Sequence, residues 1–363
     1  MISRRTLLAG LPLVAACNRL SGSGYPGFAF VSTEDAASLV AVDLMAFAVK
    51  GRISLPAPAS ALVRHPNPQK PLLYALSPGS RSAEEIDYRS RKRLRSIKLG
   101  GEPVAVRESQ GELWCLLRGA QPQIAPLEGR GIPLAAQPID FDVSSRAPLA
   151  CATLANGTIV FVDLKARRAL PPVALGDGLG QVRFRSDGSL VLVAERTKKQ
   201  LTVVDSATQS VITQLPLAVS PDHLCYDNGG QLFVTGEGRD AVVIAYPYST
   251  EIAQTPLSGR KPGTMAVSTM PPYLFVANPQ AGSVSVFDIA TQKVVAVIGA
   301  GMEPGEIAVT PDQQYALVLN KGSGDMAVIR IAAITGGRNK SAPLFTMIPV
   351  GTRPGAVLIT ASN

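Results

Sequence analysis

The sequence has 363 residues, a formal net charge of +8, 46% hydrophobic residues and only 5% aromatic residues. It contains two histidines, His65 and His223, and no paired CxxC, HExxH or CxxCH motif. A zinc site made of the protein's own ligands and a covalently attached haem are therefore disfavoured, as is a fold around a single aromatic core.

Residues 1–16 are predicted to be a signal peptide. A basic start with Arg4 and Arg5 precedes an apolar run, 7–16, which is shorter than the ~20 residues needed to cross a bilayer. The SRR start resembles a twin-arginine export motif, and the tetrad VAAC, ending at Cys17, resembles a bacterial lipobox, in which the cysteine receives a lipid.

Residues 17–26 are rich in Gly and Ser, as expected of a flexible tether behind a lipid anchor. We therefore expect an exported protein, periplasmic or on the cell surface, held to a membrane by lipidated Cys17. Asn18, and not Asp, follows the cysteine, so by resemblance to Gram-negative lipoproteins the anchor could lie in the outer membrane, with the inner membrane left open. The alternative is an ordinary signal peptide in which Cys17 is incidental.

From residue 27 to the C-terminus, one pattern recurs at a period of about 42 residues. The clearest copies are 190–230 and 273–314, and each is typical of four short strands joined by polar turns. A period of this size built from four strands predicts an all-β fold, a β-propeller occupying 27–363 as a single domain.

One small or branched apolar position aligns the copies and predicts eight blades, with seven as the alternative. It is held by Val31, Ala75, Cys115, Cys151, Val193, Val234, Val276 and Val318. The third copy, 112–147, is the weakest because Pro126 interrupts its second strand. The chain enters on a second-strand pattern and leaves on an innermost-strand pattern, so the C-terminal strand should complete the first blade.

Three recurrent features are predicted to be structural. An aspartate ends the third strand of five copies, where it can fix the following turn by accepting backbone hydrogen bonds. Cys115 and Cys151 occupy equivalent positions in adjacent blades, too far apart for a disulfide, so buried free thiols are expected. The basic run 89–95 is expected to be a solvated outer strand protected against edge pairing rather than a polyanion site.

The copies 273–314 and 315–360 resemble the YVTN-type repeats of bacterial and archaeal propellers. YLFVAN stands where that family has its name-giving strand, and EPGEIAVTPDQQ matches its proline-glycine turn. The resemblance implies a propeller, with most members uncharacterised exported or surface proteins. Its enzyme-like relatives are the haem d1 propellers and the lactonase-type propellers.

The turn into each inner strand varies between copies, and its residues should surround the mouth of the central channel. Asp140, His223 and Glu306 are predicted to face a shared funnel, with Glu102, Glu303, Lys261 and Arg353 at its lip. Convergent charges in a concavity are a ligand-binding hypothesis. No cofactor is predicted, but these residues leave a bound divalent cation open.

The first functional hypothesis is a monomeric, non-enzymatic binding or interaction scaffold of the cell envelope, whose partner is an envelope protein or a small ligand. The alternatives are a metal-dependent lactonase or lyase that uses the funnel acids, and a d1-haem-type carrier with His223 as the axial ligand. Nucleic acid is disfavoured, because stacking aromatic residues are scarce in the turns.

Overall fold

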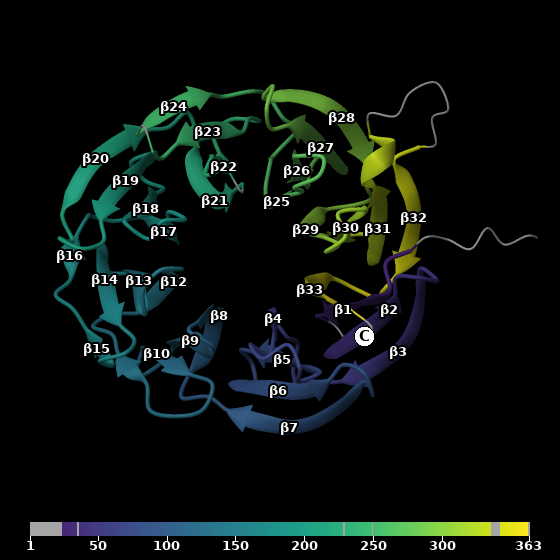
Figure 1. The fold of residues 1–363 in the computed structure, drawn as a ribbon, viewed down its shortest axis with the longest axis horizontal. Coiled ribbons are helices and arrows are strands. Elements are labelled where there is room, and N and C mark those ends of the chain that lie inside the picture. Colours follow the sequence, from purple (N-terminus) through teal and green to yellow (C-terminus); the bar gives the residue numbers. More distant parts are fainter. Residues whose placement is uncertain (1–23, 35, 228, 249, 335–341, 362–363) are drawn as a thin grey trace, which may run out of the picture.

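The computed structural model describes residues 24–34, 36–227, 229–248, 250–334 and 342–361. It is an all-β ring of eight four-stranded antiparallel blades (Figure 1), which confirms the predicted fold class and the first choice of blade number. The predicted signal peptide, the twin-arginine motif and Cys17 lie outside the described residues. Within the described part, no helix is long and apolar enough to span a membrane.

The strands of the first half are β1 Gly27–Thr33, β2 Ser38–Asp43, β3 Ala48–Ser54, β4 Ala61–Arg64, β5 Leu72–Ser77, β6 Ser82–Asp87, β7 Lys92–Lys98, β8 Glu102–Ser109, β9 Glu112–Arg118, β10 Gln123–Pro126, β11 Ile132–Pro133, β12 Pro138–Val143, β13 Leu149–Leu154, β14 Thr158–Asp163, β15 Arg168–Ala169 and β16 Val173–Ala174.

The strands of the second half are β17 Leu179–Phe184, β18 Leu190–Glu195, β19 Gln200–Asp205, β20 Val211–Pro216, β21 Ser220–Tyr226, β22 Leu232–Glu237, β23 Val243–Tyr246, β24 Glu251–Gln254, β25 Met265–Val267, β26 Tyr273–Asn278, β27 Ser283–Asp288, β28 Lys293–Gly299, β29 Pro304–Val309, β30 Tyr315–Asn320, β31 Asp325–Arg330, β32 Leu344–Pro349 and β33 Pro354–Ala361, with one 3-10 helix, η1 Ile331–Ala333.

We number the blades from the N-terminus: blade 1 contains β33, β1, β2 and β3, and blade 2 contains β4–β7. Blades 3 to 8 follow in chain order, and their inner strands are β8, β12, β17, β21, β25 and β29. Successive turns alternate between the two faces of the ring. We call the face that carries the turns into the inner strands the turn face, and the other the opposite face.

The middle strands of each blade hold the ring together. Every residue of β18, β26 and β30 is buried, because both faces of these largely apolar strands pack against neighbouring blades. All eight residues of the aligned core position are fully buried. Cys115 and Cys151 are buried free thiols, as predicted, and burial raises the pKa of the Cys115 thiol to about 12.

The ring closes as predicted. The C-terminal strand β33 pairs antiparallel with β1, with Val31 opposite Val357 and Phe30 opposite Leu358. On one side, Val357 packs on the apolar cluster shared with blade 8, and on the other, Leu358 packs on the cluster shared with blade 2. The two ends of the chain thus complete one blade.

Two blades are irregular at their outer edge. In blade 3, the copy predicted to be the weakest, β10 ends at Pro126 and the outermost strand β11 has two residues. In blade 4 the outer strand is split into β15 and β16, which pair separately with β14. The turn aspartates act as predicted: Asp205 Oδ1 accepts hydrogen bonds from the backbone N–H groups of Ala207 and Thr208 at 3.0 and 2.7 Å.

Removing residues 351–363 should destroy the ring. The deletion takes away β33, exposes the edge of β1 and removes several half-buried apolar side chains, each contributing up to about 1.5 kcal/mol. We expect loss of cooperative thermal unfolding, monitored by circular dichroism. A truncated protein with the melting temperature of the full chain would contradict this closure.

Candidate functional site

The inner strands surround the axis of the ring (Figure 1) and are its least buried regular elements apart from the outer strands. All of β4 and most of β33 are only half-buried, whereas the neighbouring second strands are almost wholly buried. Water therefore reaches the axis, and polar side chains on these strands are available for interactions there.

Several of these side chains join the inner strands of adjacent blades. Asp140 Oδ2 accepts a hydrogen bond from the backbone N–H of Val182 at 3.2 Å. In the next blade, Gln181 Oε1 accepts one from the N–H of Leu224 at 2.9 Å. Since an inner strand has no strand partner on its axial side, these contacts satisfy backbone groups that would otherwise rely on water.

A charged cluster extends this arrangement across blades 3, 4 and 5. Asp140 and Asp142 on β12 lie between Arg107 on β8 and Arg183 on β17. Arg183 Nη1 contacts Asp140 Oδ2 at 2.6 Å, and Arg107 Nε lies 3.4 Å from Asp142 Oδ1. All four side chains are less than one-third exposed, so two acids and two bases compensate one another away from bulk water.

The environment of this cluster alters the pKa of its members. Burial raises the pKa of Asp142, although Arg183, Arg107 and the backbone N–H of Phe184 oppose the shift. For Arg183, burial would lower the pKa, but Asp140 and Asp142 outweigh it and raise the pKa. Asp140, predicted as an open ligand-binding acid, is therefore committed to ion pairs.

His223 lies half-buried on β21 of blade 6. Burial lowers the pKa of its imidazole, as do Arg183 and Arg196, while Asp222 opposes the shift. Asp222 itself is paired with Arg196 at 2.6 Å. The imidazole is thus neutral at pH 7 and can act as an acceptor or as a ligand.

Glu306 lies on β29 of blade 8 and is exposed toward the ring axis. Desolvation by the surrounding walls nevertheless raises the pKa of its carboxyl group, and Lys321 opposes the shift. Lys321 is half-buried in the turn between β30 and β31, and its ammonium forms no ion pair or hydrogen bond with the described residues.

Asp140, His223 and Glu306 do not form one group. They lie on blades 4, 6 and 8, so Asp140 and Glu306 are on opposite sides of the ring (Figure 1). The electrostatic neighbours of His223 and Glu306 do not include the other two residues. Within the described ranges, no three His, Cys, Asp or Glu side chains are placed to hold a metal ion.

The four predicted lip residues lie on the turn face: Glu102 begins β8, Glu303 and Arg353 directly precede β29 and β33, and Lys261 lies in the turn before β25. Glu102 approaches Arg81 of blade 2 at 3.8 Å, and Arg353 Nε contacts Glu34 Oε2 at 2.8 Å. Lys261, Glu303 and Arg353 have positive φ values of 55°, 51° and 49°. This left-handed conformation, directly before a proline, redirects the chain into the inner strand.

A pocket of about 400 Å³ opens on the turn face between blades 8, 1 and 2. Its wall is mostly apolar and is formed by small residues, including Ala59, Gly79 and Gly355. Two charged side chains also line it, Lys321 and the paired Glu34. We call it the mouth pocket.

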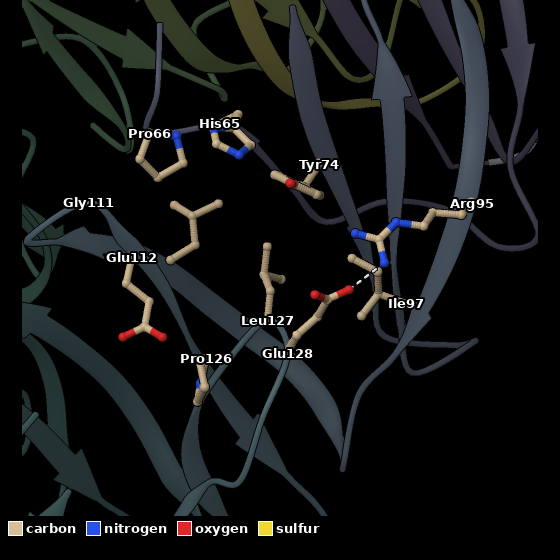
Figure 2. A pocket seen from close by; sticks show the side chains of 11 residues that line it. His65, Pro66, Tyr74, Arg95, Ile97, Gly111, Glu112, Pro126, Leu127 and Glu128 are labelled. Atoms are coloured by element: carbon tan, nitrogen blue, oxygen red, sulfur yellow. Dashed lines mark hydrogen bonds and ion pairs between the residues drawn. The ribbon is translucent and has the colours of Figure 1, made fainter. Parts of the chain in front are cut away.

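A smaller pocket, of about 240 Å³, lies on the opposite face between blades 2 and 3. Figure 2 shows His65 and Tyr74 on one side, with Arg95 joined to Glu128 by an ion pair. Arg95 also contacts Glu85 at 3.0 Å. The basic run is thus the solvated outer strand β7 that was predicted, with Arg95 already paired.

Sequence reasoning missed Arg107, Asp142, Arg183 and the role of Lys321. The first three lie two residues beyond the predicted mouth positions on their strands, so the same repeat register contained the signal. The sequence pattern did not single out Lys321. Lys321 is within electrostatic range of Glu306 because of the relative positions of β29 and the β30–β31 turn. The repeat pattern does not predict these positions.

Comparisons with known proteins support the fold and no particular activity. No family model and no curated protein matches the chain. It is similar to a structure described as dihydro-heme d1 dehydrogenase NirN in complex with DHE, with a TM-score of 0.75 and 14% identity over 92% of this chain and 75% of the other. The structure of Citrobacter koseri AztD has a TM-score of 0.71 and 13% identity over 93% of this chain and 99% of the other. That of Kuenenia stuttgartiensis hydrazine synthase has a TM-score of 0.55 and 17% identity over 84% of this chain and 92% of the other. The chain therefore has the eight-bladed propeller fold of these structures.

Replacing Glu306 with Gln should stabilise the protein at neutral and alkaline pH. Folding raises the pKa of this carboxyl above the value of about 4.3 that it has in the unfolded chain. Its contribution to the free energy of unfolding is therefore fully present below the unfolded pKa and is lost as the pH rises through the folded pKa. The melting temperature of Glu306→Gln should exceed that of the parent at pH 8, and the difference should vanish in acid. Glu303→Gln, on the nearby turn, controls for loss of a surface charge. If the difference in melting temperature between Glu306→Gln and the parent is the same at pH 8 and at pH 4, the pKa of Glu306 is not raised.

Proposed function

We propose that the protein is an exported, lipid-anchored propeller of the YVTN type that binds a small ligand at the turn face, without chemical conversion. The observation that carries the proposal is the mouth pocket, where the unpaired ammonium of Lys321 stands at an apolar wall. The desolvated carboxyl of Glu306 is within electrostatic range of this ammonium. Sites that retain costly charges in a concavity are typical of ligand binding.

The pocket chemistry favours a small amphipathic anion. A carboxylate or similar group would pair with Lys321, while an apolar body would cover Pro58, Ala59 and Pro78. Glu34 is neutralised by Arg353 and would not repel such a ligand strongly. Lys261, Glu102 and Glu303 remain proposed contacts of a larger ligand or of an envelope protein at the same face.

Filling the pocket should abolish binding without unfolding the ring. A Cβ atom on Gly355 would meet Ser32 Oγ at 3.4 Å and Glu34 Oε1 at 3.9 Å, which are ordinary contacts, and Gly355 lines the pocket. We therefore expect Gly355→Leu to fold and to fill the pocket. Lys321→Ala should weaken binding by about tenfold, the loss of one charged hydrogen bond. Gly51→Leu, where a Cβ atom meets nothing within 4 Å, is the matched control.

Binding can be measured by thermal shift with a panel of small aliphatic and aromatic carboxylates, and by native mass spectrometry of protein isolated from cells. The proposal requires at least one carboxylate that stabilises the parent and Gly51→Leu, stabilises Lys321→Ala less, and does not stabilise Gly355→Leu. Equal stabilisation of all four proteins would contradict the mouth pocket as the binding site.

A tetrapyrrole carrier is the second candidate, favoured by His223. Its neutral imidazole on an inner strand could serve as an axial ligand, and one structure with this fold is described as a complex with DHE. Haemin titration should then produce a Soret shift that His223→Ala abolishes and His65→Ala, on the opposite face, leaves intact. Because the pKa of His223 is lowered, binding should persist as pH falls through the usual histidine range near ~6.5 and weaken only below it. Identical spectra for both variants would eliminate this candidate.

A further inference from the structure

The described chain begins beside one corner of the ring. Gly24 lies against the turn between β2 and β3, because a Cβ atom there would be 2.8 Å from Met45 Cα. Tyr25 is buried in the core between blades 8 and 1, and the Leu44 N–H donates to the Gly27 carbonyl at 3.0 Å. The segment that precedes Gly24 is therefore joined to the propeller at the outer edge of blade 1, on the opposite face.

Exposed apolar side chains gather at this same corner. Met45 is 47% exposed, Val49 on β3 is 37% exposed, and Phe345 and Met347 on β32 are each 40% exposed. Phe47 connects the two blades, with its ring 4.9 Å from that of Phe345. We call these five residues the apolar wall. Figure 1 shows β3 and β32 as neighbouring outer strands beside the first residues of the ring.

The outer strands on either side of the apolar wall carry further exposed apolar side chains and, on one side, basic ones. On blade 7, the outer strand β28 exposes Val294, Val295 and Val297, the last by 65%. On blade 2, the outer strand β7 adds Lys92, Lys98 and the 54% exposed Leu94. Apolar side chains flanked by basic ones are the composition of surfaces that bind anionic bilayers.

The length of the tether makes a bilayer the natural occupant. Gly24 is the seventh residue after Cys17, and seven extended residues span at most about 25 Å. A lipid on Cys17 would therefore hold the membrane surface close to this corner without any additional partner. A protein partner would require a second binding event that nothing in the chain specifies.

We propose that the apolar wall is a membrane-docking surface that orients the propeller on an anionic lipid bilayer. The proposal rests on the lipid anchor of the proposed function and assigns to the wall the role of fixing orientation. Its side chains would enter the headgroup region, as amphipathic surface segments do. The β2–β3 turn lies on the face opposite the mouth pocket, so docking leaves that pocket open.

The test uses vesicles of phosphatidylethanolamine and phosphatidylglycerol. All eight blades and the ring closure lie within Gly27–Ala361, so a chain starting at residue 18 keeps the whole fold without the lipid. This chain should cosediment with the vesicles. Phe345→Glu combined with Met347→Glu should lower the partition coefficient by at least about tenfold, because apolar contact is lost and charge is added.

The matched control is Val211→Glu with Ile212→Glu. These residues are 42% and 52% exposed on β20, the outer strand of blade 5 on the other side of the ring (Figure 1), and their replacement should not change partitioning. On the lipidated protein, vesicles should slow hydrogen exchange in β3 and β32 but not in β20, relative to the unlipidated chain in solution.

The outcomes separate the wall from the anchor. If mass spectrometry finds that Cys17 of the mature protein carries no lipid while vesicles still bind through β32, this result would refute the lipid anchor and support the apolar wall as a docking surface. A lipidated protein whose β3 and β32 exchange as fast on vesicles as in solution would overturn the wall and leave the anchor standing. Light scattering that shows a dimer disrupted by the Phe345/Met347 pair, without vesicle binding, would assign the wall to a second copy and overturn the proposal.

Discussion

Face-to-face packing of blades is the constraint on which the rest of this structure depends. Each blade is thin and has no core of its own, so its middle strands are stable only when both faces are covered by neighbours. This requirement forces the ring to close, and the chain meets it by joining β33 to β1. It also leaves only the inner strands, the outer strands and the turns free to vary.

The inner strands use this freedom unevenly. On blades 3 to 6 one position of these strands holds a charged side chain or a thiol, namely Arg107, Asp142, Arg183 and Cys225, whereas the equivalent positions on blades 7, 8, 1 and 2 hold Ala266, Ala308, Leu358 and Leu62. The charged half is largely satisfied by its own ion pairs and backbone contacts. The mouth pocket lies in the other half, where the small residues Ala59, Gly79 and Gly355 form much of its wall. Because the charged inner strands of blades 3 to 6 are held by ion pairs and the pocket between blades 8, 1 and 2 is already open, a ligand would bind there without a rearrangement of the inner strands.

The two faces of the ring also differ in the side chains that they carry. On the turn face, basic turn residues of one blade contact the next inner strand, as Arg118 Nε does by donating to the Pro138 carbonyl at 2.8 Å. On the opposite face, near blades 8 and 1, exposed Met and Phe side chains surround the first described residues. Ligand capture and membrane contact can therefore occupy separate surfaces, since each strand carries the chain from one face to the other.

The repeat alone was sufficient to predict the blades, their number, the closing strand, the turn aspartates and the buried thiols. Each of these depends on local hydrophobic alternation or on a position that recurs in every copy, such as that of Cys115 and Cys151. What the sequence could not supply was the distance between side chains on different blades.

Only the tertiary structure decided which inner-strand residues meet. Asp140, His223 and Glu306 share a register position, but their blades are not neighbours, so common register did not mean contact. The actual partner of Asp140 is Arg183 on the adjacent blade, whereas Glu306 forms no ion pair and is influenced electrostatically by Lys321 on a turn of its own blade. The apolar wall likewise joins residues from the two ends of the chain, which no local pattern links. The sequence by itself determined the repeating unit, because that unit is specified within about 42 residues, whereas ring closure determined the sites, because their members come from different repeats.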